Sequence, residues 1–307
     1  MGYQDMPGFH VVVMVVGIIS LAVYLLIMMS ILRYRKTDPA LRSSFFTLTL
    51  AQSVPATILY LISAGFVRPR KFGLIHFEPR IHSEIARFSY YAQAVTRTAL
   101  VISFLIVALN RFTAVRMPIQ FTTIWKAKTI GLAVLSSWLI SISFATPIFY
   151  QANANFSWVP NGKLGGLALT MNEDLREKDK MSSAIVECSV ALMCFILYAY
   201  SIGFVVLKAP RKALKDDVHL LISAAVSCSP LLFVIFSRIF AWIAVEMKDV
   251  SMRAIASDLW FVSSEVLISA QPWCFLATSG LIRTTTSKFV KSFTHSSADQ
   301  ISTSPSS

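Results

Sequence analysis

Charged side chains are scarce in this chain of 307 residues: Asp, Glu, Lys and Arg make up 14% of it, whereas hydrophobic residues make up 55%. Water-soluble domains carry roughly 25% charged residues. The motifs of soluble enzymes are also missing, since the chain contains no HExxH, no nucleophile elbow and no phosphate-binding loop. The composition therefore excludes a soluble globular protein. It predicts a membrane protein without enzymatic activity and without a cofactor.

Cysteine is rare too, with Cys188, Cys194, Cys228 and Cys274 as its four occurrences. All four lie in hydrophobic stretches, where a cysteine usually behaves as a small apolar residue. None lies well inside the long polar segment 150–182, so no disulfide is predicted to join that segment to its surroundings. The few histidines are too scattered to predict a metal site.

Long hydrophobic runs are what the chain has in abundance. Each is close to the ~20 residues that a helix needs to cross a bilayer, and they lie at 9–32, 44–66, 88–110, 129–149, 183–207, 218–244 and 255–281. Continuous rather than alternating runs favour helices over a β-barrel. The sequence thus predicts an all-α membrane protein, with a seven-transmembrane helix bundle over 1–281. A Ser/Thr-rich cytoplasmic tail follows over 282–307 and is expected to be disordered beyond His295.

The loops predict which side of the membrane each end faces. Arg33, Arg35 and Lys36 directly follow the first run, and such clusters normally lie in the cytoplasm. This places the N-terminus outside and, after seven spans, the C-terminus inside. Asn155, in the triplet Asn-Phe-Ser, is a potential glycosylation site in a loop that this topology places outside. The net charge of +12 indicates contact with anionic membrane lipids rather than with nucleic acid.

The third run carries the most informative residues. Arg97 lies inside it, and an arginine within a membrane span usually faces protein or water rather than lipid. The run ends at Asn110, Arg111 and Phe112. A boundary arginine can exchange local partners for the exposed carbonyls of a docked helix. The alternative is that Arg111 only anchors the helix at the lipid head groups.

Seven spans and an Asn-Arg-Phe triplet after the third resemble a G-protein-coupled receptor, although Asn110 stands where that class has an acid. The segment LNRFTAVRMPIQFTTIW, over 109–125, resembles the nematode serpentine chemoreceptors of the class gamma superfamily. The segment SFFTL, over 44–48, favours class V over class gamma proper.

The resemblance implies a chemosensory receptor in the plasma membrane of sensory cells. Such a receptor binds a small-molecule ligand and couples to a heterotrimeric G protein, here through Asn110, Arg111 and Phe112. Pro230 and Pro272 resemble the mid-helix prolines of the sixth and seventh receptor helices, which permit a changeable bend; static kinks are the alternative. A small transporter or channel is the other candidate function, because intramembrane charges also line solute paths. The two halves show no repeat of the kind that many transporters have.

Five polar residues are predicted to line the ligand site, namely Gln93, Arg97, Glu187, Arg238 and Glu265. The depth of the four charges follows from the rise of about 1.5 Å per helical residue. Arg97 and Glu265 fall at one level, and Glu187 and Arg238 both fall at the outer rim. We therefore predict an Arg97–Glu265 pair across the pocket and a Glu187–Arg238 pair at its mouth. The alternative is that each charge contacts only water or backbone.

Overall fold

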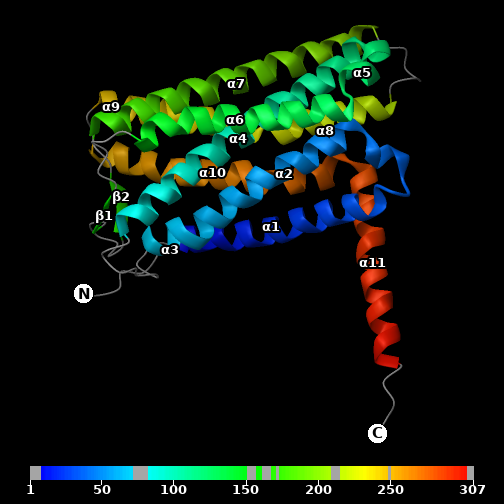
Figure 1. The fold of residues 1–307 in the computed structure, drawn as a ribbon, viewed down its shortest axis with the longest axis horizontal. Coiled ribbons are helices and arrows are strands. Elements are labelled where there is room, and N and C mark those ends of the chain that lie inside the picture. The colour runs from blue at the N-terminus through cyan, green and yellow to red at the C-terminus, as the bar shows by residue number, and fades with distance from the viewer. Residues whose placement is uncertain are drawn as a thin grey trace.

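The structure, a computed structural model, describes residues 8–71, 82–150, 157–160, 167–170, 173–208, 215–247 and 250–302. Within these residues the chain is almost entirely helical (Figure 1). The long helices lie side by side in one bundle, and a shorter C-terminal helix points away from it. The predicted seven-helix bundle is confirmed.

The bundle consists of seven long segments, each of which overlaps one predicted hydrophobic run. They are α1 (Gly8–Tyr34), α2 (Ser44–Ile62), α4 (His82–Arg116), α6 (Ala127–Tyr150), α7 (Glu173–Lys208), the pair α8 (Lys215–Cys228) and α9 (Pro230–Glu246), and α10 (Val250–Thr278). Shorter elements join or extend them. These are the 3-10 turn η1 (Pro39–Arg42), the π-helical turn η2 (Ser63–Val67), α3 (Arg68–Lys71), α5 (Pro118–Ile124) and α11 (Gly280–Ser302).

A small hairpin lies at one end of the bundle and was not predicted. Strand β1 (Ser157–Pro160) pairs antiparallel with β2 (Leu167–Thr170), in a register that joins Ser157 to Thr170. We call this end of the bundle the hairpin end, and the opposite end, where α10 meets α11, the α11 end (Figure 1).

Six helical segments among the described residues are long and apolar enough to cross a membrane. They lie in α1, α2 with η2, α4, α6, α7 and α8–α9. The seventh, α10, is not among these six and carries Asp258 and Glu265. Its Glu265 is 2% exposed, because it points into the bundle rather than toward the surroundings.

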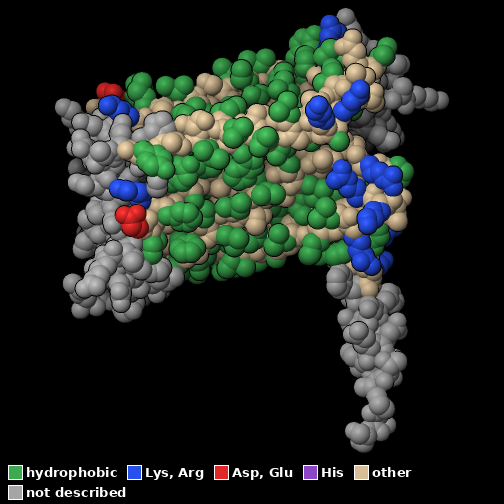
Figure 2. All heavy atoms as spheres, viewed as in Figure 1, with side chains coloured by type: hydrophobic (Ala, Val, Ile, Leu, Met, Phe, Trp, Pro, Cys, Tyr) green, Lys and Arg blue, Asp and Glu red, His purple; other side chains and the backbone are tan. Residues whose placement is uncertain are grey.

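The outer face of the bundle is apolar. Leu132 and Leu139 on α6, and Leu192 and Ile196 on α7, are between 54% and 65% exposed. In Figure 2 hydrophobic side chains cover the middle of the visible face, and Lys and Arg gather at the α11 end. An exposed apolar surface of this extent marks contact with a membrane.

Helix α4 is the most central element and packs against α2, α6, α7 and α8. Its Leu100, Val101 and Phe104 are buried in the core. Because α4 runs the length of the bundle, it carries Arg97 toward the hairpin end and Arg111 toward the α11 end.

The sixth hydrophobic run is two helices rather than one. Helix α8 ends at Cys228, and α9 begins at Pro230, its first residue. Proline fits this position well because the first turn of a helix needs no backbone N–H donor. Pro272, by contrast, lies inside α10, where its ring removes one backbone hydrogen bond.

The C-terminal segment also departs from expectation. Helix α11 continues to Ser302, beyond His295, where the sequence predicts disorder. It is attached to the bundle through Ser30 of α1, whose hydroxyl lies 3.3 Å from that of Thr286, and through the buried Phe289.

Candidate functional site

Three buried charges from three helices meet near the hairpin end. Arg97 of α4, Glu187 of α7 and Arg238 of α9 form what we call the charge cluster. Arg97 Nε donates to Glu187 Oε1 over 2.6 Å, and Arg97 Nη2 donates to Oε2 over 3.3 Å. Arg238 Nε donates to Oε2 over 2.8 Å, and its Nη2 donates to Oε1 over 3.0 Å. One carboxylate therefore accepts two bidentate guanidinium groups.

Helix α10 closes the charge cluster from a fourth side. Arg97 Nη1 donates to the hydroxyl of Ser264. The same guanidinium lies 5.1 Å from the centroid of the Trp260 ring, one helical turn before Ser264. A cation over an aromatic face is attracted by the ring quadrupole. Contacts with α7 and α10 thus hold Arg97 of α4 in place.

A second polar contact lies beside the charge cluster. The Tyr90 hydroxyl of α4 donates to the carboxylate of Asp179, which precedes the membrane-spanning part of α7. Burial raises the pKa of the Asp179 carboxyl above its usual range, and this outweighs the opposing effects of the Tyr90 hydrogen bond and the Arg238 charge. A raised pKa favours the neutral acid.

The structure confirms one of the two predicted ion pairs and contradicts the other. The Glu187–Arg238 pair is confirmed, with a closest N–O distance of 2.8 Å. The Arg97–Glu265 pair is wrong, because Arg97 binds Glu187 and Glu265 binds Arg68, 2.8 Å away. Depth along a helix does not fix the direction in which a side chain points. Successive residues differ by about 100° around the axis, and it is Ser264, not Glu265, that faces Arg97.

The Arg68–Glu265 pair was missed because Arg68 was assigned to a loop. Both residues are 2% exposed, and Ser63 of η2 donates to Glu265 Oε1 over 3.2 Å. The three guanidinium nitrogens of Arg68 and the Oε2 atom of Glu265 make no hydrogen bond with any described residue. The π-helical turn η2, which directly precedes Arg68, is the kind of irregularity that often accompanies functional positions.

Helix α1 approaches this pair closely at Gly17. A Cβ atom there would lie 2.7 Å from Tyr60 Cε2 and 3.0 Å from Glu265 Oε2. A side chain at this position would force the Tyr60 ring or the Glu265 carboxylate to shift, so glycine permits the close approach of α1. Tyr60 also donates to the backbone oxygen of Met14 over 3.4 Å.

Gln93, the fifth residue predicted to line the ligand site, is not part of these contacts. It lies one turn before Arg97 on α4 and is half-buried. Within the described part of the chain, its side chain makes no hydrogen bond to the charge cluster. Asn155 lies outside the described residues, so its glycosylation stays a prediction.

At the α11 end, the triplet Asn110, Arg111 and Phe112 is folded into the bundle. Arg111 is 3% exposed and donates through Nε and Nη2 to Asn110 Oδ1, over 3.1 Å and 2.5 Å. Asn110 Nδ2 in turn donates to Ser44 at the start of α2, over 2.9 Å. The guanidinium of Arg111 also lies 4.7 Å from the centroid of the Phe45 ring. A neutral amide oxygen, rather than a carboxylate, thus accepts from the arginine.

The rest of the segment 109–125 folds back onto α4. Phe112 packs against Tyr200 of α7, with ring centroids 5.7 Å apart. Trp125, at the end of α5, donates through Nε1 to the Thr113 hydroxyl over 2.6 Å. The motif residues therefore form one structural unit around the α11 end of α4.

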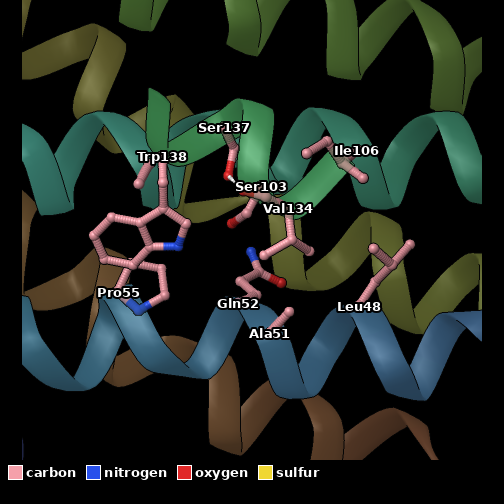
Figure 3. Close-up of a pocket in the computed structure, with 10 residues that line it drawn as sticks. Leu48, Ala51, Gln52, Pro55, Ser103, Ile106, Val134, Ser137 and Trp138 are labelled. Atoms are coloured by element: carbon pink, nitrogen blue, oxygen red, sulfur yellow. Dashed lines mark hydrogen bonds between the residues drawn. The ribbon is translucent and has the colours of Figure 1, made fainter. Parts of the chain in front are cut away.

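A small pocket between α2, α4 and α6 is too small for an organic ligand. Its cavity volume is about 10 Å³, which is space for roughly one water molecule. Figure 3 shows Gln52, Ser103 and Ser137 pointing into it, with Trp138 to one side. Gln52 is 2% exposed, and its Nε2 atom has no hydrogen-bond partner among the described residues.

Seven packed helices with an apolar outer face, and two buried arginines fourteen residues apart on α4, are the arrangement expected of a seven-transmembrane receptor of the G-protein-coupled class. The family described as serpentine type 7TM GPCR chemoreceptor Srv matches residues 13–294. The chain belongs to this family. The match confirms the resemblance to the serpentine chemoreceptors and the preference for class V. No curated protein matches the chain at a significant level.

Proposed function

We propose that this chemoreceptor is activated by a small molecule bound at the hairpin end and that it activates a heterotrimeric G protein at the α11 end. The proposal rests chiefly on the two buried arginines of α4. Arg97 is fixed in the charge cluster, and Arg111 is held by Asn110. Fourteen residues separate them, so they lie about 21 Å apart along the helix. Membership of a G-protein-coupled chemoreceptor family supports this reading over a transporter.

The charge cluster joins helices that a ligand would rearrange. A ligand that competes for the donors of Arg97 and Arg238 changes the contacts among α4, α7 and α9. Helix α9 begins after a break at Ser229, and such a break lets it move relative to α8. Displacement of α7 or α9 against α4 then alters the packing around Phe112 and Tyr200 at the other end.

Arg111 is the group that such a rearrangement releases. Its acceptor is the neutral oxygen of Asn110, and hydrogen bonds with only one charged partner are weaker than ion pairs of the same geometry. Once free of Asn110, the guanidinium donates to the last backbone carbonyls of a docked G-protein helix.

The orientation follows from the distribution of charge. The α11 end carries the cationic residues of the α1–α2 connection, of the start of α6 and of α11, namely Arg33, Arg35, Lys36, Arg42, Lys126, Lys128, Arg283, Lys288 and Lys291. Figure 2 shows such side chains gathered at that end. The positive-inside rule places it in the cytoplasm, against anionic head groups. The hairpin end then faces the outside of the sensory cell's plasma membrane.

The Arg111→Ala variant tests the proposal. Cells expressing the wild-type chain are screened with small molecules, and the purified receptor is assayed for nucleotide exchange on a G protein. We expect Arg111→Ala to abolish exchange while surface expression stays near the wild-type level. Arg116→Ala is the matched control, because Arg116 is an exposed arginine near the same helix end. Normal exchange by a well-expressed Arg111→Ala receptor would disprove the coupling role.

A further inference from the structure

The hydrogen bonding of the charge cluster limits the class of ligand that it can take. An ionised carboxylate offers about four lone-pair sites. In Glu187 all four are used, since Arg97 and Arg238 each donate two hydrogen bonds to it. Glu187 is also 4% exposed. A cationic ligand therefore finds no free acceptor on the carboxylate.

Donors, in contrast, remain available. A guanidinium carries five N–H groups. Arg97 uses three of them, two on Glu187 and one on Ser264. Arg238 uses two, both on Glu187, among the described residues. Its side chain is 11% exposed, against 6% for Arg97. Arg238 is thus the member of the charge cluster that a ligand reaches first.

The net charge of the charge cluster also disfavours a cationic ligand. Two guanidinium groups face one carboxylate, and the nearby Asp179 already accepts from Tyr90. An unbalanced charge inside a protein is costly, and a counter-ion that brings hydrogen-bond acceptors relieves that cost. Ion pairs of this kind are strengthened where water is excluded.

We propose that the ligand is a small organic monoanion, such as a carboxylate, whose oxygens accept from the free N–H groups of Arg238 and Arg97. Primary amines and other cations are rejected, because they meet two guanidinium groups and a saturated carboxylate. This inference rests on the proposed function, since it specifies the ligand of the same receptor.

Matched probe sets test the inference on the wild-type receptor in nanodiscs. One set is hexanoate, hexanamide and hexylamine, and the other is benzoate, benzamide and benzylamine. Binding is measured by the shift of the thermal unfolding midpoint over a concentration series up to the millimolar range. We expect the acid of at least one set to bind at least tenfold more tightly than its amide, and the amines to give no shift. An amine that binds as well as its acid, or acids that give no shift in either set, would overturn the proposal.

Two variants assign the preference to the charge cluster. Arg238→Gln should reduce the acid-over-amide ratio to near one. Lys178→Gln, which removes an exposed cation from the same end of α7, should leave the ratio unchanged. If a folded Arg238→Gln receptor keeps the wild-type acid-over-amide ratio, the proposal is also overturned. If that variant does not fold, the binding of acids, amides and amines to the wild-type receptor decides the proposal. If nucleotide exchange depends on Arg111 but the receptor shows no preference for acids, the proposed function stands and only the inference about the ligand is rejected.

Discussion

The charge cluster and the Arg68–Glu265 pair are both buried between helices, but they differ in how fully their polar atoms are bonded. In the charge cluster, both oxygens of Glu187 accept two hydrogen bonds each. In the pair, Glu265 receives one N–O contact of 2.8 Å from Arg68 and one hydrogen bond from Ser63, counting the described residues. The guanidinium group of Arg68 makes no hydrogen bond of good geometry among the described residues.

This difference separates two roles for a buried ion pair. A buried charge is costly to desolvate, and only good geometry with additional hydrogen bonds offsets that cost. The charge cluster meets this condition and therefore holds α4, α7 and α9 together. The Arg68–Glu265 pair does not meet it, since each unsatisfied buried polar group costs roughly 1–3 kcal/mol. The pair should thus contribute little net stability.

The largest effect is expected for Glu187→Ala. This change leaves Arg97 and Arg238 buried without their shared partner, and breaking a buried ion pair costs about 3–5 kcal/mol. The yield of monodisperse receptor in size-exclusion chromatography should fall steeply. A further Arg238→Met change should recover part of the loss, because it removes one of the two unpaired cations. Wild-type yield from Glu187→Ala alone would contradict the structural role.

The Arg68–Glu265 pair should respond differently to loss of one or both members. Arg68→Ala and Glu265→Ala each leave a buried charge unpaired and should lower the unfolding midpoint markedly. Replacement of both, as Arg68→Met with Glu265→Leu, should return stability to within about 1 kcal/mol of the wild type, because apolar replacements of buried pairs are often neutral. The control is Arg97→Met with Glu187→Leu, which still leaves Arg238 unpaired and should not recover. If the two double variants have the same change in unfolding midpoint relative to the wild type, the two sites do not differ in their contribution to stability.

Gly17→Ala tests how tightly α1 packs against the Arg68–Glu265 pair. The added methyl would lie 2.7 Å from the Tyr60 ring, and overpacking of this kind costs about 1–3 kcal/mol. Gly203→Ala on α7 is the control, because nothing lies within 4 Å of its added methyl. Alanine is favoured over glycine within helices by about 0.5–1 kcal/mol, so this control should be neutral or stabilising. Thermal unfolding of the two variants side by side measures the difference.

The smallest effect is expected at Gln52. Its Nε2 atom is buried without a partner among the described residues, so Gln52→Leu should raise stability by about 1 kcal/mol. Gln271 offers a contrast, because its Nε2 atom also has no partner among the described residues but its Oε1 atom accepts from the Tyr24 hydroxyl over 2.9 Å. Gln271→Leu should therefore lower stability. Loss of stability in Gln52→Leu would show that the small pocket supplies Gln52 with a partner, such as a water molecule.

The helices and the Glu187–Arg238 ion pair could be predicted from the sequence, because they depend on the lengths of apolar runs and on residue spacing along them. Continuous apolar runs predict the seven helical segments. Distance from the helix end gives the shared depth of Glu187 and Arg238, and the short connection between their helices predicts contact. The Arg97–Glu265 prediction fails because rotation about the helix axis is set by packing, which one sequence does not encode locally. The turn η2 extends α2 so that Arg68 lies inside the bundle. No local sequence pattern predicts this extension.

Other features depend on contacts that form only in the folded chain. The hairpin of β1 and β2 lies in a segment without a clear alternation of apolar residues. Helix α11 is polar on much of its surface, so its composition predicts disorder, while its burial of Phe289 against the bundle favours a helix. The segment 109–125 predicts the coupling role of Arg111. Only the structure shows that Asn110 accepts two hydrogen bonds from it.

The amide at position 110 has a consequence for the conditions under which the receptor works. A carboxylate in its place would bind a proton once the surrounding solution became acidic enough, and its interaction with the arginine would then weaken. An amide has no proton to exchange in this range. The hydrogen bonds between Asn110 and Arg111 should therefore keep the same strength in acidified and resting cells, and the proposed coupling step through Arg111 should not depend on the pH of the cytoplasm.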